Sequence, residues 1–464
     1  MPQQPVAIAP RAIPHPLPEA RAEPPLIRDL LVRHFAPAEL EELAVTRREF
    51  AHWMRPDIQR ELEALFSALP ECRFYGARIR DDSLDFRFPN LLEAGEGAIA
   101  VGPAVYFDID IGDETPVRCL LRGIWLAHLD ALPFALLVNV DEGYSGTRLR
   151  VEIAVPPGAD AETLAVRTLK RLDAATSAAR SLRGKVLTIE GEKTGFTVEP
   201  ATVKVQRTAL VSREEIILPA KTLALIERST TGFVRHLDRL VELGMSPRRG
   251  VLLYGPPGVG KTLTVRYLSG ALPGFTTLII AAEQFDSLGE YFEMARRLQP
   301  AMVVLEDIDL IGADRSGPWA NAPAKLNHLL NEMDGLGTDA RILFVLTTNR
   351  ADVLEPALAG RPGRVDQAIE FGLPDDAERR RLIRRYACAL APSEELAAAA
   401  SRRMGKVSPA FIKELMRRAA LNMMDRGGAA LELADLEAAT DDMLVLGGSL
   451  NANLLGHRTG LGFT

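Results

Sequence analysis

The sequence predicts an α/β protein, with an α+β domain in front of a central domain and a helical domain behind it. Its 464 residues correspond to about three folding units at about 150 residues each. Short apolar runs typical of buried strands, at 251–254 and 301–305, alternate with helical stretches such as 263–271. With 47% hydrophobic residues, 25% charged residues and a mean hydropathy of +0.02, the composition excludes a wholly disordered or fibrous chain.

Charge and cysteine usage narrow the class further. The 55 basic and 62 acidic residues give a net charge of −7, so we expect no nucleic-acid partner, because phosphate neutralisation needs a basic surplus. Cys72, Cys119 and Cys388 are odd in number and far apart, which argues against a disulfide framework or a zinc knuckle. The most apolar stretch, roughly 120–140, is interrupted by charged residues, so no membrane span is expected. A soluble cytoplasmic protein is predicted.

The first 208 residues divide into a tail and a domain. Residues 1–25 contain eight prolines and are expected to form a disordered tail. Helical spacing dominates 26–69, whereas later segments alternate as strands do, and an Ala- and Leu-rich helix follows. We therefore expect an α+β domain over 26–208 that binds a substrate or partner. Its predicted strands lie at 106–111, 136–140 and 149–155, and its predicted helix lies at 161–182.

A glycine-rich loop follows the strand 251–254. Its pattern, GxxxxGK[ST] between a strand and a helix, is typical of phosphate binding, because glycines let backbone N–H groups face phosphate oxygens and the helix N-terminus adds positive potential. We expect Lys261 to reach the β and γ phosphates and Thr262 to coordinate Mg²⁺. The predicted nucleotide-binding residues are Gly255, Pro256, Pro257, Gly258, Val259, Gly260, Lys261, Thr262 and Leu263.

Two carboxylates, Glu306 and Asp307, follow the second apolar strand at 301–305. Carboxylates at a strand end beside a phosphate-binding loop are placed to hold Mg²⁺ and to orient an attacking water. The sequence therefore predicts that both residues take part in metal binding and in hydrolysis of the nucleotide.

Besides the glycine loop, distinctive motifs occupy the segments 305–309, 326–336, 346–350, 357–366 and 369–375. Through these motifs the sequence from about residue 216 to 444 resembles the AAA ATPases. The motifs are similar to the branch containing proteasomal ATPases, membrane AAA proteases and the mitochondrial Rieske-protein translocase. The resemblance implies a parallel-sheet P-loop core at 209–375 and a helical lid at 376–446, with ATP and Mg²⁺ as cofactors. The Gly- and Asn-rich segment 447–464 is expected to be a flexible tail.

The resemblance also implies roles for single residues. Asn349 matches the sensor residue that polarises the attacking water. Arg361 and Arg364 match arginine fingers, which reach the nucleotide of a neighbouring subunit and neutralise charge in the transition state. Fingers acting between subunits imply a homohexamer. We therefore expect an ATPase that remodels or unfolds protein substrates as a chaperone-like ring.

Three departures from the family pattern stand out. Most members place Asp before Glu, whereas here Glu306 comes first, so that the shorter Asp307 falls on the catalytic-base position; either the backbone compensates or hydrolysis is slow. The segment 282–291, where threading members carry a pore loop, is several residues shorter than in those members. Phe285 or Trp319 is a candidate for lining a pore, although packing in a loop is the simpler interpretation of Trp319. An extra residue also precedes the finger motif.

Two functions remain open at this point. One is a threading unfoldase; the other is a non-threading ATP-driven assembly factor or conformational switch, which the short segment favours. The sequence ends in Gly462, Phe463 and Thr464, unlike the hydrophobic–Tyr–any-residue ending of proteasome-docking ATPases, so docking to a protease chamber is not expected. The sequence contains no His-Glu-x-x-His motif of a zinc protease.

Overall fold

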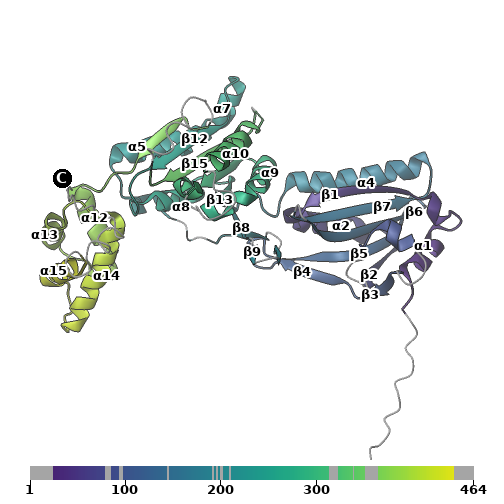
Figure 1. The fold of residues 1–464 in the computed structure, drawn as a ribbon, viewed down its shortest axis with the longest axis horizontal. Coiled ribbons are helices and arrows are strands. Elements are labelled where there is room, and N and C mark those ends of the chain that lie inside the picture. The colour runs from purple at the N-terminus through teal and green to yellow at the C-terminus, as the bar shows by residue number, and fades with distance from the viewer. Residues whose placement is uncertain are drawn as a thin grey trace, which may run out of the picture.

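Figure 1 shows the computed structural model as three successive bodies, the N-terminal domain, a central sheet domain and a helical lid. The structure describes residues 24–78, 85–92, 98–143, 146–190, 193–194, 197–198, 202–207, 209, 211–312, 322–337, 339–350 and 364–443. The predicted tail at 447–464 lies outside these ranges, and so does the predicted tail at 1–25 except for its last two residues.

The N-terminal domain is an antiparallel sheet with helices on both faces. Its strands follow the order β1-β7-β6-β5-β2-β3, and β4 also pairs with β5. The strands are β1 (Ala44–Ala51), β2 (Cys72–Arg78), β3 (Ala100–Gly102), β4 (Val105–Ile109), β5 (Val117–Leu129), β6 (Leu132–Gly143) and β7 (Gly146–Val155).

Alternation along these strands explains the two apolar faces. One face of the sheet packs against α2 (Arg55–Ser67) and α4 (Ala159–Ala178), and the other packs against α1 (Ile27–Phe35) and α3 (Phe88–Leu92). In β7, for example, Val151 and Ile153 belong to the first core, whereas Ala154 belongs to the second. A period of two places neighbouring residues on opposite faces, which is why both faces can be covered.

Strand β1 is an exception within 26–69, which is mostly helical as the sequence predicts. Residues 44–51 pair with β7 along their whole length, from Ala44 opposite Val155 to Ala51 opposite Arg148. The strand lies at the edge of the sheet and is largely exposed, so its polar residues conceal the usual strand pattern. Long-range pairing determines its conformation.

The central domain contains a mostly parallel sheet of order β11-β8-β13-β14-β15-β12-β16, in which only β11 runs antiparallel to its neighbour β8. This arrangement confirms the predicted α/β class. The strands are β8 (Val186–Glu190), β11 (Thr202–Val205), β12 (Arg249–Tyr254), β13 (Thr276–Ile280), β14 (Ala301–Leu305), β15 (Ile342–Thr348) and β16 (Gln367–Glu370). A separate two-stranded pair is formed by β9 (Lys193–Thr194) and β10 (Thr197–Val198).

Helices cover both faces of this sheet. One face carries α5 (Ala220–Ser229), α6 (Thr231–Arg235), α7 (Leu237–Glu242) and α8 (Lys261–Ala271), and the other carries α9 (Leu288–Arg297) and α10 (Ala322–Asp334). The central strands are buried on both faces, so they consist of almost uninterrupted apolar runs, as expected for parallel sheets.

The N-terminal domain ends earlier in the structure than the predicted boundary at residue 208. Strand β8 pairs in parallel with β13, Val186 opposite Thr277 and Leu187 opposite Leu278. Strands β8 and β11 therefore belong to the central sheet, and the N-terminal domain ends between α4 and β8. This pairing joins segments far apart in the sequence, which is why local patterns did not reveal it.

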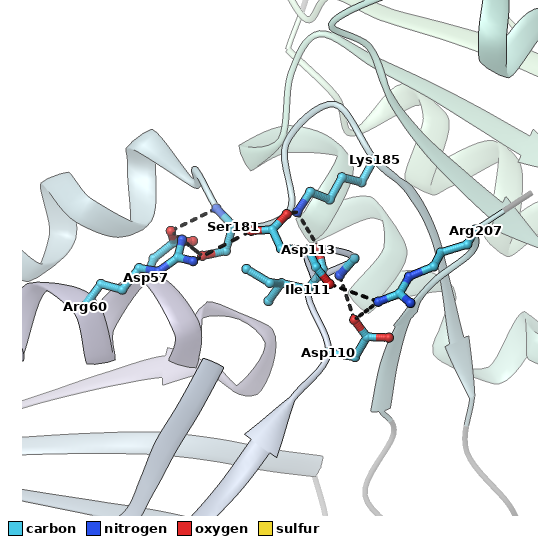
Figure 2. A network of polar contacts seen from close by, with 9 residues as sticks. Asp57, Arg60, Asp110, Ile111, Asp113, Ser181, Lys185 and Arg207 are labelled. Atoms are coloured by element: carbon cyan, nitrogen blue, oxygen red, sulfur yellow. Dashed lines mark hydrogen bonds and ion pairs between the residues drawn. The ribbon is translucent and has the colours of Figure 1, made fainter. Parts of the chain in front are cut away.

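The N-terminal and central domains share one continuous apolar core. Ile111 of the first domain and Leu187, Ile189 and Val203 of the second lie in the same buried cluster, which extends to Leu278. A polar network borders this junction (Figure 2).

Lysine and arginine side chains flanking β8 and β11 form that network with the loop after β4. Lys185 Nζ donates to Asp113 Oδ1 at 2.7 Å and also to the carbonyl of Ile111. Arg207 Nη2 donates to the carbonyl oxygen of Asp113 at 3.0 Å and contacts Asp110 Oδ1 at 3.3 Å. The domains are therefore packed together and are not merely tethered.

The lid is a bundle of α12 (Asp376–Tyr386), α13 (Glu394–Met404), α14 (Pro409–Asp425) and α15 (Leu433–Asp441), with its own apolar core. Its helices begin at residues that suit them. Asp375 and Ser408, for example, accept hydrogen bonds from backbone N–H groups three residues on. The helical lid expected from the sequence is confirmed.

Candidate functional site

The glycine loop joins β12 to α8, as the motif requires. Gly255 has a φ of +150°, and a Cβ there would lie 2.2 Å from the carbonyl oxygen of Phe371, so only glycine fits. Gly258 has a φ of +75°, and its carbonyl accepts from the N–H of Ala410 at 3.2 Å. The loop is therefore held between the central sheet and the first turn of lid helix α14.

Lys261 lies inside this loop and is only 6% exposed. Its Nζ donates to the carbonyl oxygens of Gly255 at 2.8 Å and Pro256 at 3.0 Å, and to Asn349 Oδ1 at 2.9 Å. Burial lowers the pKa of Lys261, while the nearby carboxylates Asp307 and Asp309 act in the opposite direction. The loop thus holds an ammonium group where phosphate oxygens are expected to bind.

Glu306 and Asp307, which follow β14, turn to different partners. The Thr262 hydroxyl is hydrogen-bonded to the Glu306 carboxylate, and burial raises the pKa of Glu306, with the charge of Asp307 adding to the effect. Asp307 instead accepts from Asn349 Nδ2 at 3.2 Å. A hydroxyl beside a carboxylate is an all-oxygen set that suits Mg²⁺, so Thr262 and Glu306 fit the metal role expected from the sequence.

Asn349 therefore connects two predicted site residues, because its amide oxygen contacts Lys261 and its amide nitrogen contacts Asp307. Asp309, to which the sequence analysis gave no role, fixes this arrangement. Its Oδ1 accepts from Thr348 Oγ1 at 2.8 Å and from the Asn349 N–H at 3.0 Å. The only signal for Asp309 in the sequence is its place in the acidic run after β14.

The predicted arginine fingers lie only partly within the described residues. Arg361 lies outside them. Arg364 is 8% exposed and binds Asp334 of the same chain through two hydrogen bonds, at 2.9 and 2.5 Å. Arg248 donates to the carbonyl oxygens of Met333 and Leu336, so two arginines hold the end of α10.

Of the two candidates for lining a pore, Trp319 lies outside the described residues. The structure contradicts the predicted pore-lining role of Phe285. Phe285 is 4% exposed and packs in the apolar core with α9, so it cannot line a channel. The short segment around it is attached to β8: Gln284 Nε2 donates to the carbonyl of Ile189 at 2.7 Å, and the Tyr291 hydroxyl accepts from the Ile189 N–H at 2.6 Å.

Replacing Phe285 with alanine is expected to destabilise the central domain by about 3–5 kcal/mol, because a large buried side chain leaves a cavity. Denaturant unfolding of the full chain measures this. The matched control is Phe107→Ala on strand β4, where the ring is 54% exposed and the loss should be small. Equal stability of the Phe285→Ala and wild-type chains would contradict the core assignment.

The fold and the site together define a P-loop nucleotide-binding domain with a helical lid. Residues 251–373 match the family model described as the ATPase family associated with various cellular activities, AAA. The chain therefore contains a domain of the AAA ATPase family, whose cofactors are ATP and Mg²⁺.

Similar proteins include three bacterial enzymes named ATP-dependent zinc metalloprotease FtsH. FtsH 3 of Sphaerobacter thermophilus is 37% identical over 225 residues, which cover 46% of this chain and 45% of that protein. FtsH 2 of Sorangium cellulosum is 30% identical over 386 residues, 78% of this chain and 61% of the relative. FtsH of Rhodococcus erythropolis is 36% identical over 223 residues, 45% of this chain and 26% of the relative. The chain thus spans between about a quarter and three fifths of the length of these relatives.

Two features are absent from the part of the chain that the structure describes. Within it, no helix is both long and apolar enough to span a bilayer. Within it, too, no cluster of three or more His, Cys, Asp or Glu side chains is placed to hold a metal ion by itself.

Proposed function

We propose that this chain hydrolyses ATP as a hexameric ring and uses the energy to remodel a protein partner bound by its N-terminal domain. The observation that carries the proposal is the connected set Lys261–Asn349–Asp307, with Thr262 beside Glu306 in the same site. Phosphoryl transfer requires three kinds of group: a cation that binds phosphate, oxygen ligands for a metal, and a carboxylate with a neighbouring amide to orient the water.

Each part has a role in the proposed reaction. Loop N–H groups and Lys261 would bind the phosphates, and Thr262 and Glu306 would hold Mg²⁺, which would supply charge neutralisation at the phosphates. Asp307 accepts a proton from the attacking water, and Asn349 orients that water together with Asp307. Arg361 and Arg364 of an adjacent subunit stabilise the charge that develops in the transition state.

A protein substrate is supported by the similar proteins, whose names describe ATP-dependent proteases and whose shared segment includes the ATPase domain. Two modes of action remain for such a ring, threading of the substrate or conformational switching. The burial of Phe285 and the attachment of Gln284 to β8 favour switching, because this segment is packed as a fixed part of the core.

A fluorescent folded reporter carrying an unstructured tag separates the two modes. With ATP present, we expect steady ATP hydrolysis and unchanged reporter fluorescence. ATP-dependent loss of fluorescence would support threading and overturn the switching mode. Absence of hydrolysis under all nucleotide and metal conditions would overturn the ATPase proposal itself.

A further inference from the structure

The backbone of Asp307 is left-handed, with a φ of +47°. Such a conformation is uncommon for residues other than glycine, and among them Asp and Asn adopt it several times more often than others, because their short polar side chains make local hydrogen bonds. Asp307 comes two residues after the end of the buried strand β14, at the site where the carboxylate is needed. The unusual backbone and the proposed catalytic residue therefore coincide.

A buried threonine on the neighbouring strand holds this backbone. The N–H of Asp307 donates to Thr347 Oγ1 at 2.9 Å, and Thr347 is 1% exposed. Strands β14 and β15 are paired up to Leu305 opposite Leu346, so Thr347 lies one residue beyond the last pair, level with the turn. On the other side of Asp307, its carbonyl accepts from the N–H of Leu310 at 2.8 Å.

The side chain of Asp307 is thereby aimed by its backbone. A short carboxylate has little reach of its own, so the direction of its Cα–Cβ bond decides where it lies. Here it contacts Asn349 Nδ2, and Asn349 in turn contacts Lys261. A right-handed backbone at residue 307 would direct the carboxylate elsewhere and would break the bond to Thr347.

We propose that Thr347 is a positioning residue that holds Asp307 in the left-handed conformation required for hydrolysis. This inference rests on the proposed ATPase function. It also explains the order of the acidic pair: the left-handed position favours Asp over Glu, so the longer Glu306 occupies the metal side and the shorter Asp307 the water side. The backbone compensates for the missing methylene.

The experiment compares steady-state hydrolysis and ATP binding in three variants of the full chain. Thr347→Val keeps the shape and removes the hydroxyl, and we expect kcat to fall about 10–100-fold, since misplacement by about 1 Å costs that much, with ATP affinity within about twofold of wild type. Thr347→Ser keeps the hydroxyl and should restore kcat to within about threefold. Thr188→Val is the matched control, because Thr188 is a buried sheet threonine whose hydroxyl has no hydrogen-bond partner among the described residues.

Wild-type kcat in Thr347→Val, in a chain that hydrolyses ATP, would overturn the inference while leaving the ATPase proposal intact. A wild-type chain without hydrolysis would overturn the ATPase proposal first. If Thr347→Val does not fold, Asp307→Glu provides the second test. It retains a carboxylate but suits the left-handed backbone poorly, so its kcat should fall at least about 10-fold, and an equal or higher kcat would contradict the proposal.

Discussion

Asp307→Asn is expected to bind ATP normally and to hydrolyse it about 10²–10⁴-fold more slowly, the usual contribution of a general base. Asparagine keeps the shape and tolerates the left-handed backbone, so the bond to Thr347 should survive. Lys261 and Thr262, the proposed ligands of the phosphates and of the metal, are unchanged. The measurement is single-turnover hydrolysis together with ATP affinity, and it tests the role of the carboxylate alone.

The control for this variant is Asp425→Asn, an exposed aspartate at the last position of lid helix α14. It should hydrolyse ATP at the wild-type rate. Unchanged hydrolysis in Asp307→Asn would assign the base to another residue. Because the slow variant should keep ATP bound, it also provides a means to capture the natural partner in the ATP state.

Arg364→Ala is expected to lower hydrolysis by about 10³–10⁵-fold if Arg364 acts as an arginine finger, with ATP affinity retained. In the single chain Arg364 is bound to Asp334, so the neighbouring nucleotide must compete with that carboxylate. Arg381→Ala, at an exposed position of α12, is the control and should behave as wild type. A thermal melt of each variant separates lost chemistry from lost fold.

Mixing variants tests whether the finger acts between subunits. Arg364→Ala subunits keep their phosphate-binding loop, and Lys261→Ala subunits keep their finger. Co-assembled rings should therefore hydrolyse ATP well above the sum of the separate variants, because each type supplies what its neighbour lacks. A mixture no more active than that sum would place the finger within its own subunit or exclude a ring.

The sequence was most informative where backbone geometry determines residue type. Gly255 and Gly258 need positive φ angles, and Lys261 follows them at a fixed spacing, so the nucleotide site could be predicted before the fold was known. The buried strands β12 and β14 could be predicted because continuous apolar runs mark strands covered on both faces, whereas the helical lid was implied by the family resemblance.

Features that depend on contacts between distant segments could not be predicted. Strand β8 joins the central sheet through β13, and β1 is a strand only because β7 pairs with it. Phe285 resembles a pore residue in the sequence, but its surroundings in the apolar core make it structural. Thr347 is one β-branched residue in an apolar strand, and only the left-handed turn opposite shows what its hydroxyl does.

The shared core between the N-terminal and central domains has a mechanical consequence. Independent rotation of either domain would expose the apolar surface around Ile111, Leu187 and Val203 to water. That exposure costs about 25 cal/mol of free energy per Å² of apolar surface. The two domains are therefore expected to move as one rigid unit, joined at the β8–β11 edge of the central sheet. A tilt of strands β8 and β13 would therefore be carried through this shared core to the N-terminal domain.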